Sequence, residues 1–151
     1  MAELISHALT EPLLRKLQGE QFVLLATIDE ETGVPAVNAV SWVYAPDTER
    51  IRIAVGHKSR MIGNVTVHPG ACVTMIGPDT TYEITGKATV TQAPLEGVQI
   101  KLACLELKVE TVKSVMFYGA KIVQEVKVEK TYDKEAADKL DRQVLEALKR
   151  S

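Results

Sequence analysis

The feature that most constrains the fold of this chain is a series of short strand-like segments separated by polar turns. Arg50–Val55 shows the pattern most clearly, because Ile51, Ile53 and Val55 alternate with the arginines at positions 50 and 52. Most neighbouring segments are joined by short turns, which favours antiparallel pairing. The other predicted strands are Phe22–Ile28, Val34–Ala45, Ala71–Ile76, Thr81–Thr91, Val109–Phe117 and Ile122–Val128.

Helices are predicted where capping residues precede apolar residues at helical spacing. Thr10 and Pro12 mark the start of a short N-terminal helix that ends at Gly19. Further helices are predicted at Ser59–Val67, Pro94–Glu106 and Asp133–Lys149. The last of them is expected to carry i,i+4 ion pairs between Glu135 and Lys139, Asp138 and Arg142, and Glu146 and Arg150.

The segments do not alternate as βαβ units, so the chain is predicted to be mainly β (α+β). An antiparallel barrel of about six to seven strands, with short peripheral helices and a C-terminal helix, accommodates so many short strands. Gly86 is predicted to mark a bulge or a barrel bend inside its strand. Residues 1–151 contain no linker or repeat and are expected to form a single domain.

Composition excludes several classes of function. The chain has 18 Lys and Arg against 20 Asp and Glu, a net charge of −2, and therefore lacks the basic excess of a nucleic-acid-binding protein. Its longest apolar runs, such as Phe22–Ile28, are too short to span a membrane, and the first ten residues do not form a signal-peptide pattern. Cys72 and Cys104 are isolated and are expected to be small buried side chains in a reduced, cytoplasmic protein.

The familiar catalytic and phosphate-binding motifs are missing from the sequence. We find no phosphate loop, no dinucleotide-binding glycine fingerprint, no nucleophile elbow and no paired-histidine zinc motif. His7, His57 and His68 stand far apart, so no metal site is expected.

The most informative stretch is Gly56–Asn64, where a strand ends, two cations follow and a helix begins. Amides at a helix start and the positive end of the helix dipole attract anions. Lys58 and Arg60 add positive charge, and a guanidinium suits phosphate oxygens. The spacing leaves open the alternative of a solvated turn in which Ser59 only caps the helix.

A second informative stretch is Asn38–Trp42, where Asn38 and Ser41 interrupt an otherwise apolar strand. Small and polar residues would let a flat ring lie along this strand, with backbone groups reaching the edge of the ring. An ordinary amphipathic strand with an outward face is the alternative.

Taken with their surroundings, these stretches resemble a known family. Phe22–Asp29, Gly33–Pro35, Ser59–Val65 and His68–Pro69 are similar to motifs of the pyridoxamine 5'-phosphate oxidase-like, flavin-binding split β-barrels. The similarity covers about residues 20–92, and the remainder fits in its order of elements.

The resemblance implies a split-barrel homodimer that binds FMN at the subunit interface. Met61 stands where the family commonly has a second phosphate-binding lysine, so Met61→Lys is expected to strengthen FMN binding. Trp42 and the apolar side of Val109–Phe117 are expected in the dimer contact. The implied flavin site places the ring along Asn38, Ala39, Val40 and Ser41, the ribityl chain beside Val55 and Gly56, and the phosphate at Lys58, Ser59 and Arg60.

The expected function is therefore that of an FMN-dependent oxidoreductase acting on an unidentified small molecule, without an identified acid or base among its side chains. A non-catalytic flavin or haem carrier, or a redox or stress sensor on the same scaffold, is the alternative. A deazaflavin enzyme is a third possibility that fold similarity leaves open. No match to the oxidase's substrate-phosphate residues is found near the C-terminus, which argues against oxidation of pyridoxamine phosphate.

Overall fold

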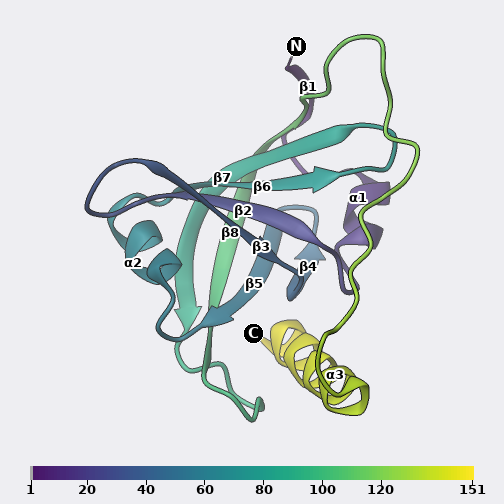
Figure 1. Cartoon of the computed structure of the whole chain (residues 1–151). Helices are drawn as coiled ribbons and strands as arrows, with labels where there is room; N and C mark the ends of the chain where they lie inside the picture. The colour runs from purple at the N-terminus through teal and green to yellow at the C-terminus, as the bar shows by residue number, and fades with distance from the viewer. Residues whose placement is uncertain (1) are drawn as a thin grey trace.

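The computed structural model describes residues 2–151 and shows one curled antiparallel sheet with helices at its periphery (Figure 1). Its eight strands are β1 (Glu3–Ser6), β2 (Val23–Ile28), β3 (Pro35–Val40), β4 (Val43–Asp47), β5 (Arg50–Gly56), β6 (Gly70–Ile76), β7 (Thr81–Gln92) and β8 (Leu102–Ser114). The helices within these residues are α1 (Glu11–Lys16), α2 (Arg60–Val67) and α3 (Lys134–Arg150). The mainly β fold with a C-terminal helix is confirmed, with one strand more than the upper expectation.

The strand order leaves an opening in the barrel. Neighbouring strands follow the path β3-β2-β6-β7-β8-β5-β4, and β1 pairs with β8 beside this path. The two ends of the path, β3 and β4, are consecutive in the chain and meet at a bend instead of pairing with each other. The barrel is therefore split beside β3, where the sheet has a free edge.

Two groups of apolar side chains hold the fold together. The larger one fills the barrel, and its biggest fully buried members are Leu13, Leu17, Leu25, Ile51, Ile53, Met75, Ile84, Leu105 and Leu107. The smaller one lies under α3 and contains Ala54, Leu95, Leu102, Cys104, Val144, Ala147 and Leu148. Burial of this second group fixes α3 against β4 and β5.

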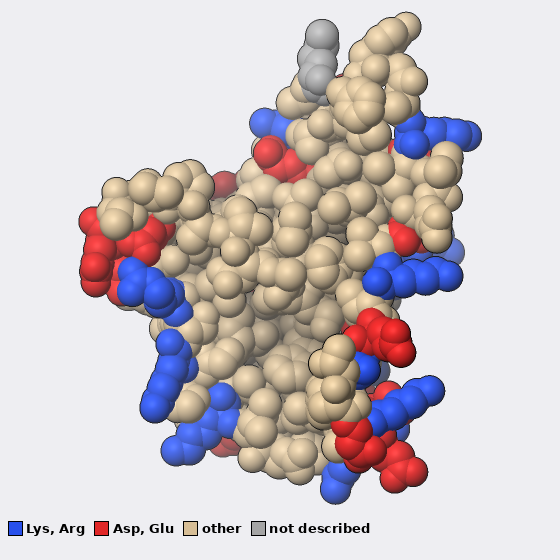
Figure 2. Space-filling view, in the orientation of Figure 1, with Lys and Arg blue, Asp and Glu red and all other residues tan. Residues whose placement is uncertain are grey.

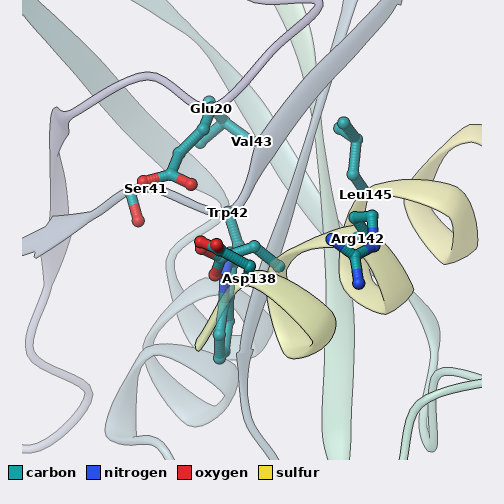
Figure 3. A pocket seen from close by; sticks show the side chains of 8 residues that line it. Glu20, Ser41, Trp42, Val43, Asp138, Arg142 and Leu145 are labelled. Atoms are coloured by element: carbon teal, nitrogen blue, oxygen red, sulfur yellow. Dashed lines mark hydrogen bonds between the residues drawn. The ribbon is translucent and has the colours of Figure 1, made fainter. Parts of the chain in front are cut away.

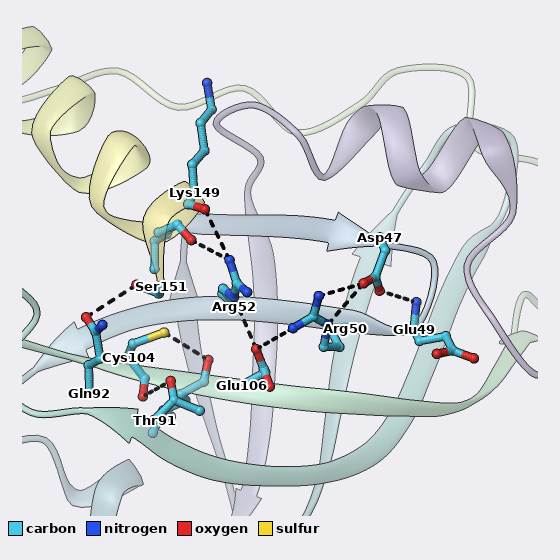
Figure 4. Close-up of polar contacts among 12 residues, drawn as sticks. Asp47, Glu49, Arg50, Arg52, Thr91, Gln92, Cys104, Glu106, Lys149 and Ser151 are labelled. Carbon is cyan, nitrogen blue, oxygen red and sulfur yellow. Dashed lines mark hydrogen bonds and ion pairs between the residues drawn. The ribbon is translucent and has the colours of Figure 1, made fainter.

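A buried guanidinium ties the end of α3 to the sheet (Figure 4). Arg52 is 7% exposed, its Nη1 donates to the carbonyl of Leu148 at 2.9 Å, and its Nε lies 3.1 Å from Oε1 of Glu106. The guanidinium thus contacts the carbonyl end of a helix and a carboxylate. These two contacts compensate for its removal from water.

One sequence prediction about the strands is wrong near the opening. Val34–Ala45 does not form one strand, because the chain bends at Ser41 and Trp42 and divides it into β3 and β4. The bend lets Trp42 pack with the apolar group under α3. Tertiary packing therefore interrupts a run that local pattern favours as continuous.

The C-terminal half departs further from the predictions. Pro94–Glu106 is not a helix, since residues 94–101 form turns and β8 begins at Leu102. Val109–Phe117 is only the second half of β8, which ends at Ser114. Ile122–Val128 is not a strand and makes a single bridge, from Ile122 to Asp79.

Residues 115–133, which we call the strap, connect β8 to α3 across the outside of the sheet (Figure 1). Ion pairs hold the strap in place: Lys16 lies 2.9 Å from Glu125, and Lys130 lies 3.2 Å from Glu20 and 3.3 Å from Asp141. None of the helices in the described chain is long and apolar enough to cross a membrane.

Candidate functional site

The predicted start of α2 is confirmed. Ser59 caps the helix, with its Oγ accepting a hydrogen bond of 3.2 Å from the amide of Met61. The amide of Ser59 donates to the carbonyl of Gly56 at 2.9 Å, so the helix follows β5 after one tight turn. Lys58 and Arg60 are both exposed on this turn. Two cations and the first amides of a helix are thereby gathered on one surface.

Arg60 also makes a contact that the sequence did not reveal. Its Nη2 lies 2.7 Å from Oδ1 of Asp29, in the turn between β2 and β3. This guanidinium holds the pKa of the Asp29 carboxyl well below its usual range, and the carboxylate raises the pKa of Arg60. Figure 2 shows the acidic turn as a projection with basic side chains beside it. The Arg60 side chain remains 62% exposed, with N–H groups available to an anion.

Asn64 fixes α2 against the same turn. Its Nδ2 donates to Oγ1 of Thr27 at 3.0 Å, and its Oδ1 accepts from the amide of Glu30 at 3.0 Å. Asn64 and Thr27 are buried, so the bond between these two side chains forms away from water. The start of α2 is consequently held in one position relative to β2 and β3.

β3 presents an open edge, and the turn that precedes it contacts the start of α2 through Asp29. It pairs with β2 through six residue pairs, and its other edge has no strand partner among residues 2–151. Asn38 and Ala39 are exposed, while Val40 and Ser41 are half-buried. The free edge offers backbone donors and acceptors to a ligand.

Two contacts link the elements that carry the two predicted stretches. At one end the amide of Ala54 donates to the carbonyl of Trp42 at 3.0 Å, and β5 then continues to Val55 and Gly56. At the other end the Arg60–Asp29 ion pair joins α2 to the turn before β3. Asn38, Ala39, Val40 and Ser41 lie on β3 and the bend that follows it, and Gly56, Lys58, Ser59 and Arg60 lie at the end of β5 and the start of α2.

Two residues beside the β5–α2 turn, Val55 and Met61, have buried side chains. Val55 is 4% exposed and packs into the barrel core, so only its backbone borders the opening. Met61 is 7% exposed and also packs into the core, so its side chain points away from the opening. A longer cation at position 61 would have to leave that core to reach a ligand.

The structure adds a cavity that the sequence did not reveal (Figure 3). It has a volume of about 280 Å³ and lies between α3 and the bend that joins β3 to β4. The bend supplies Ser41, Trp42 and Val43, and α3 supplies Asp138, Asp141, Arg142 and Leu145, with Glu20 completing the lining. The indole Nε1 of Trp42 donates to Oδ1 of Asp141 at 2.8 Å.

The strap contributes a second, smaller cavity of about 210 Å³, where Val128–Lys130 face Ala39–Ser41 across a gap. Local pattern could not identify either cavity, because the residues that meet there are roughly 90 positions apart in sequence. Within residues 2–151, no three His, Cys, Asp or Glu side chains are grouped to hold a metal ion.

Comparison with known proteins places the chain in a family. The model of the pyridoxamine 5'-phosphate oxidase family matches residues 9–147. The chain belongs to this family. No curated protein matches the chain significantly.

Solved structures share the fold at low sequence identity. A Lactobacillus delbrueckii protein, named as a candidate pyridoxamine 5'-phosphate oxidase, is 20% identical over 74% of this chain and 98% of its own, with a TM-score of 0.61. HupZ of Group A Streptococcus is 14% identical over 76% of this chain and 98% of its own, with a TM-score of 0.58. An F420 reductase is 18% identical over 69% of this chain and 98% of its own, with a TM-score of 0.57.

The donor set at the opening fits FMN, the cofactor implied by the family resemblance. Lys58, Arg60 and the Ser59 hydroxyl can donate to phosphate oxygens. The free edge of β3 offers alternating N–H and C=O groups, which suit the donors and acceptors of a flavin's pyrimidine edge. One opposing feature is the Asp29 carboxylate, which competes with phosphate for Arg60.

Proposed function

We propose that this protein binds FMN in the opening between β3 and the β5–α2 turn, and that it is an oxidoreductase acting on a small molecule. The observation that supports this most directly is an unpartnered strand edge whose preceding turn is tied by the Arg60–Asp29 ion pair to a helix start with two exposed cations. When bound, FMN would supply the electron or hydride transfer, and the protein would orient it and tune its charge.

In this proposal each side of the opening has a separate task. Lys58, Ser59 and Arg60 hold the phosphate, with Arg60 positioned by its ion pair to Asp29. Val55 and Gly56 contact the ribityl chain through their backbone. Residues 38–41 align the ring through the free edge of β3.

We further propose that two copies of the chain cover the opening as a homodimer. One face of β3, formed by Pro35, Val37 and Ala39, is exposed, and Val34 and Val37 are 58% and 62% exposed. The face shown in Figure 2 carries its charges mostly at the margins. A free strand edge with exposed valines is normally protected by a partner. Trp42 packs against α3 of its own chain, so we assign the contact to β3. A stable monomer in sedimentation at micromolar concentration would contradict this assignment.

The second candidate function is a non-catalytic carrier or sensor of flavin or haem on the same scaffold. It is favoured by the ion pair of Arg60 with Asp29 and the capping contact of Ser59, which give these side chains positioning and structural roles and no acid–base role. A deazaflavin in place of FMN is a third possibility. The absorbance spectrum of protein purified without added cofactor, with mass spectrometry of what it releases, separates these cofactors. Steady turnover with a reduced nicotinamide donor separates an enzyme from a carrier.

A paired titration tests the phosphate site. FMN and riboflavin differ only in the phosphate, so wild type and Arg60→Ala are titrated with both at matched salt. We expect Arg60→Ala to weaken FMN binding about ten- to hundredfold and to leave riboflavin binding unchanged. Arg60→Lys should weaken FMN binding less than alanine. Equal losses for the two ligands, or no loss for either, would show that Arg60 does not hold the phosphate.

A further inference from the structure

The larger cavity beside Trp42 has an apolar body and a rigid aromatic wall (Figure 3). The Trp42 ring is fixed at its Nε1 by Asp141, and Asp141 is in turn held by Lys130 of the strap at 3.3 Å. Leu145 and Val43 line the cavity as well. A fixed indole face beside aliphatic side chains offers stacking to a flat molecule and attraction to a cation.

The charges around this cavity favour a cation. The carboxylates of Glu20, Asp138 and Asp141 line the cavity. The nearby cations are Arg142 in the lining and Lys130, which pairs with two of these carboxylates, so the net charge of the site is −1. Lys130 is shared by Glu20 and Asp141. The ion pair expected between Asp138 and Arg142 does not form, and Asp138 has no ion-pair partner within residues 2–151. Asp138 lines the cavity from α3 and is exposed to solvent.

We propose that this cavity binds a small organic cation, a protonated amine on a flat apolar body, and that the molecule carries no phosphate. The apolar body packs between Trp42 and Leu145, and the ammonium group faces Asp138. A phosphate dianion on the same molecule would meet the carboxylates of the lining.

The role of this molecule as a substrate rests on the proposed FMN site, whereas its binding does not. Ser41 lines the cavity and also belongs to the stretch, residues 38–41, that we assign to the flavin ring. A molecule in the cavity would therefore lie beside the ring, at the position that a substrate requires. The inference narrows the unknown small molecule to amines without a phosphate group.

Trp42 makes the cavity directly observable, because it is the only tryptophan in the chain. We would titrate the protein without added FMN and follow tryptophan emission, using benzylamine, benzyl alcohol and benzoate as probes of equal size and different charge. We expect a saturable change with benzylamine, at least about tenfold tighter than with benzyl alcohol, and no saturable change with benzoate. Equal affinities for the three probes would overturn the proposal.

Asp138→Asn removes the charge at constant shape and is expected to abolish the preference for benzylamine over benzyl alcohol. Glu135→Gln is the matched control, since Glu135 is exposed in the same helix and does not line the cavity. A preference that persists in Asp138→Asn would overturn the assignment of Asp138, and thermal unfolding checks that the variant folds.

Flavin fluorescence measured with FMN alone keeps the two proposals distinguishable. Binding of benzylamine without binding of FMN would reject the proposed function and retain the cation site. Binding of FMN without binding of benzylamine would reject the cation site alone.

Discussion

The guanidinium of Arg60 donates to the carboxylate of Asp29 across 2.7 Å and so joins the start of α2 to the turn between β2 and β3. The contact positions a cation at the proposed phosphate site and also partly neutralises it. Oδ2 of the same carboxylate accepts hydrogen bonds from the amides of Glu31 and Thr32, so Asp29 organises its own turn as well. The geometry therefore sets a limit on how strongly Arg60 can bind an anion.

We predict that Asp29→Asn strengthens FMN binding by about two- to fivefold, because Arg60 no longer shares its charge with a carboxylate. The asparagine oxygen can still accept from the turn amides. Affinity is measured by quenching of flavin fluorescence. Asp47→Asn is the control, since it breaks an Asp–Arg pair of the same 2.7 Å length, made with Arg50 away from the opening. Weaker FMN binding in Asp29→Asn would mean that the pair supports the site.

The pH dependence of stability should follow the two lowered carboxyl pKa values. Hydrogen bonding by Arg50 lowers the pKa of Asp47, as Arg60 does for Asp29. A carboxyl with a lower pKa in the folded than in the unfolded state stabilises the fold above its unfolded pKa, and this contribution is lost as the pH falls through the folded pKa.

We therefore predict that wild type melts above Asp47→Asn at about pH 7, and that the difference disappears as the pH falls below about 4, the ordinary range for Asp. Thermal unfolding followed by circular dichroism over this range measures it. Glu135→Gln, at an exposed site, should match wild type throughout. A difference that grows in acid would contradict the prediction.

Met61→Lys is predicted to destabilise the protein, a cost that the sequence alone did not reveal. The Met61 side chain packs in the barrel core, so a lysine there must bury its ammonium or leave its place. The free energy of unfolding should fall by about 1–3 kcal/mol in a urea titration. Met61→Leu keeps the apolar volume and should cost less than about 1.5 kcal/mol. A lysine variant of unchanged stability with tighter FMN binding would restore the original expectation.

The parts of the fold that could be predicted from sequence are those with a local cause. β5 follows from its alternation, α2 from the Ser59 cap, and α3 from its apolar stripe after Asp133. Whether residues 38–41 and 55–60 hold FMN stays a prediction.

The parts that could not be predicted depend on distant partners. Leu95, Leu102 and Leu105 are buried, as a helix over Pro94–Glu106 would require. However, Leu95 lies in a loop, and the other two lie in β8, which pairs with β5 and β7. β1 was not predicted at all, and it exists through pairing with β8. The Trp42 cavity likewise needs α3, which lies roughly 90 residues away.

Gly86 is a strand glycine that packs against the backbone of Lys108, a residue distant in sequence. The pairing of β7 with β8 shifts register between Thr85 and Gly86, as the glycine predicted. A Cβ on Gly86 would lie 1.9 Å from the carbonyl oxygen of Lys108, so Gly86→Ala must push two backbones apart. We expect a loss of about 3 kcal/mol or more in the free energy of unfolding. Gly70→Ala is the control: a Cβ there meets nothing within 4 Å, and the change should stay within about 1 kcal/mol. Equal stability of the two variants would show that the bulge relaxes without cost.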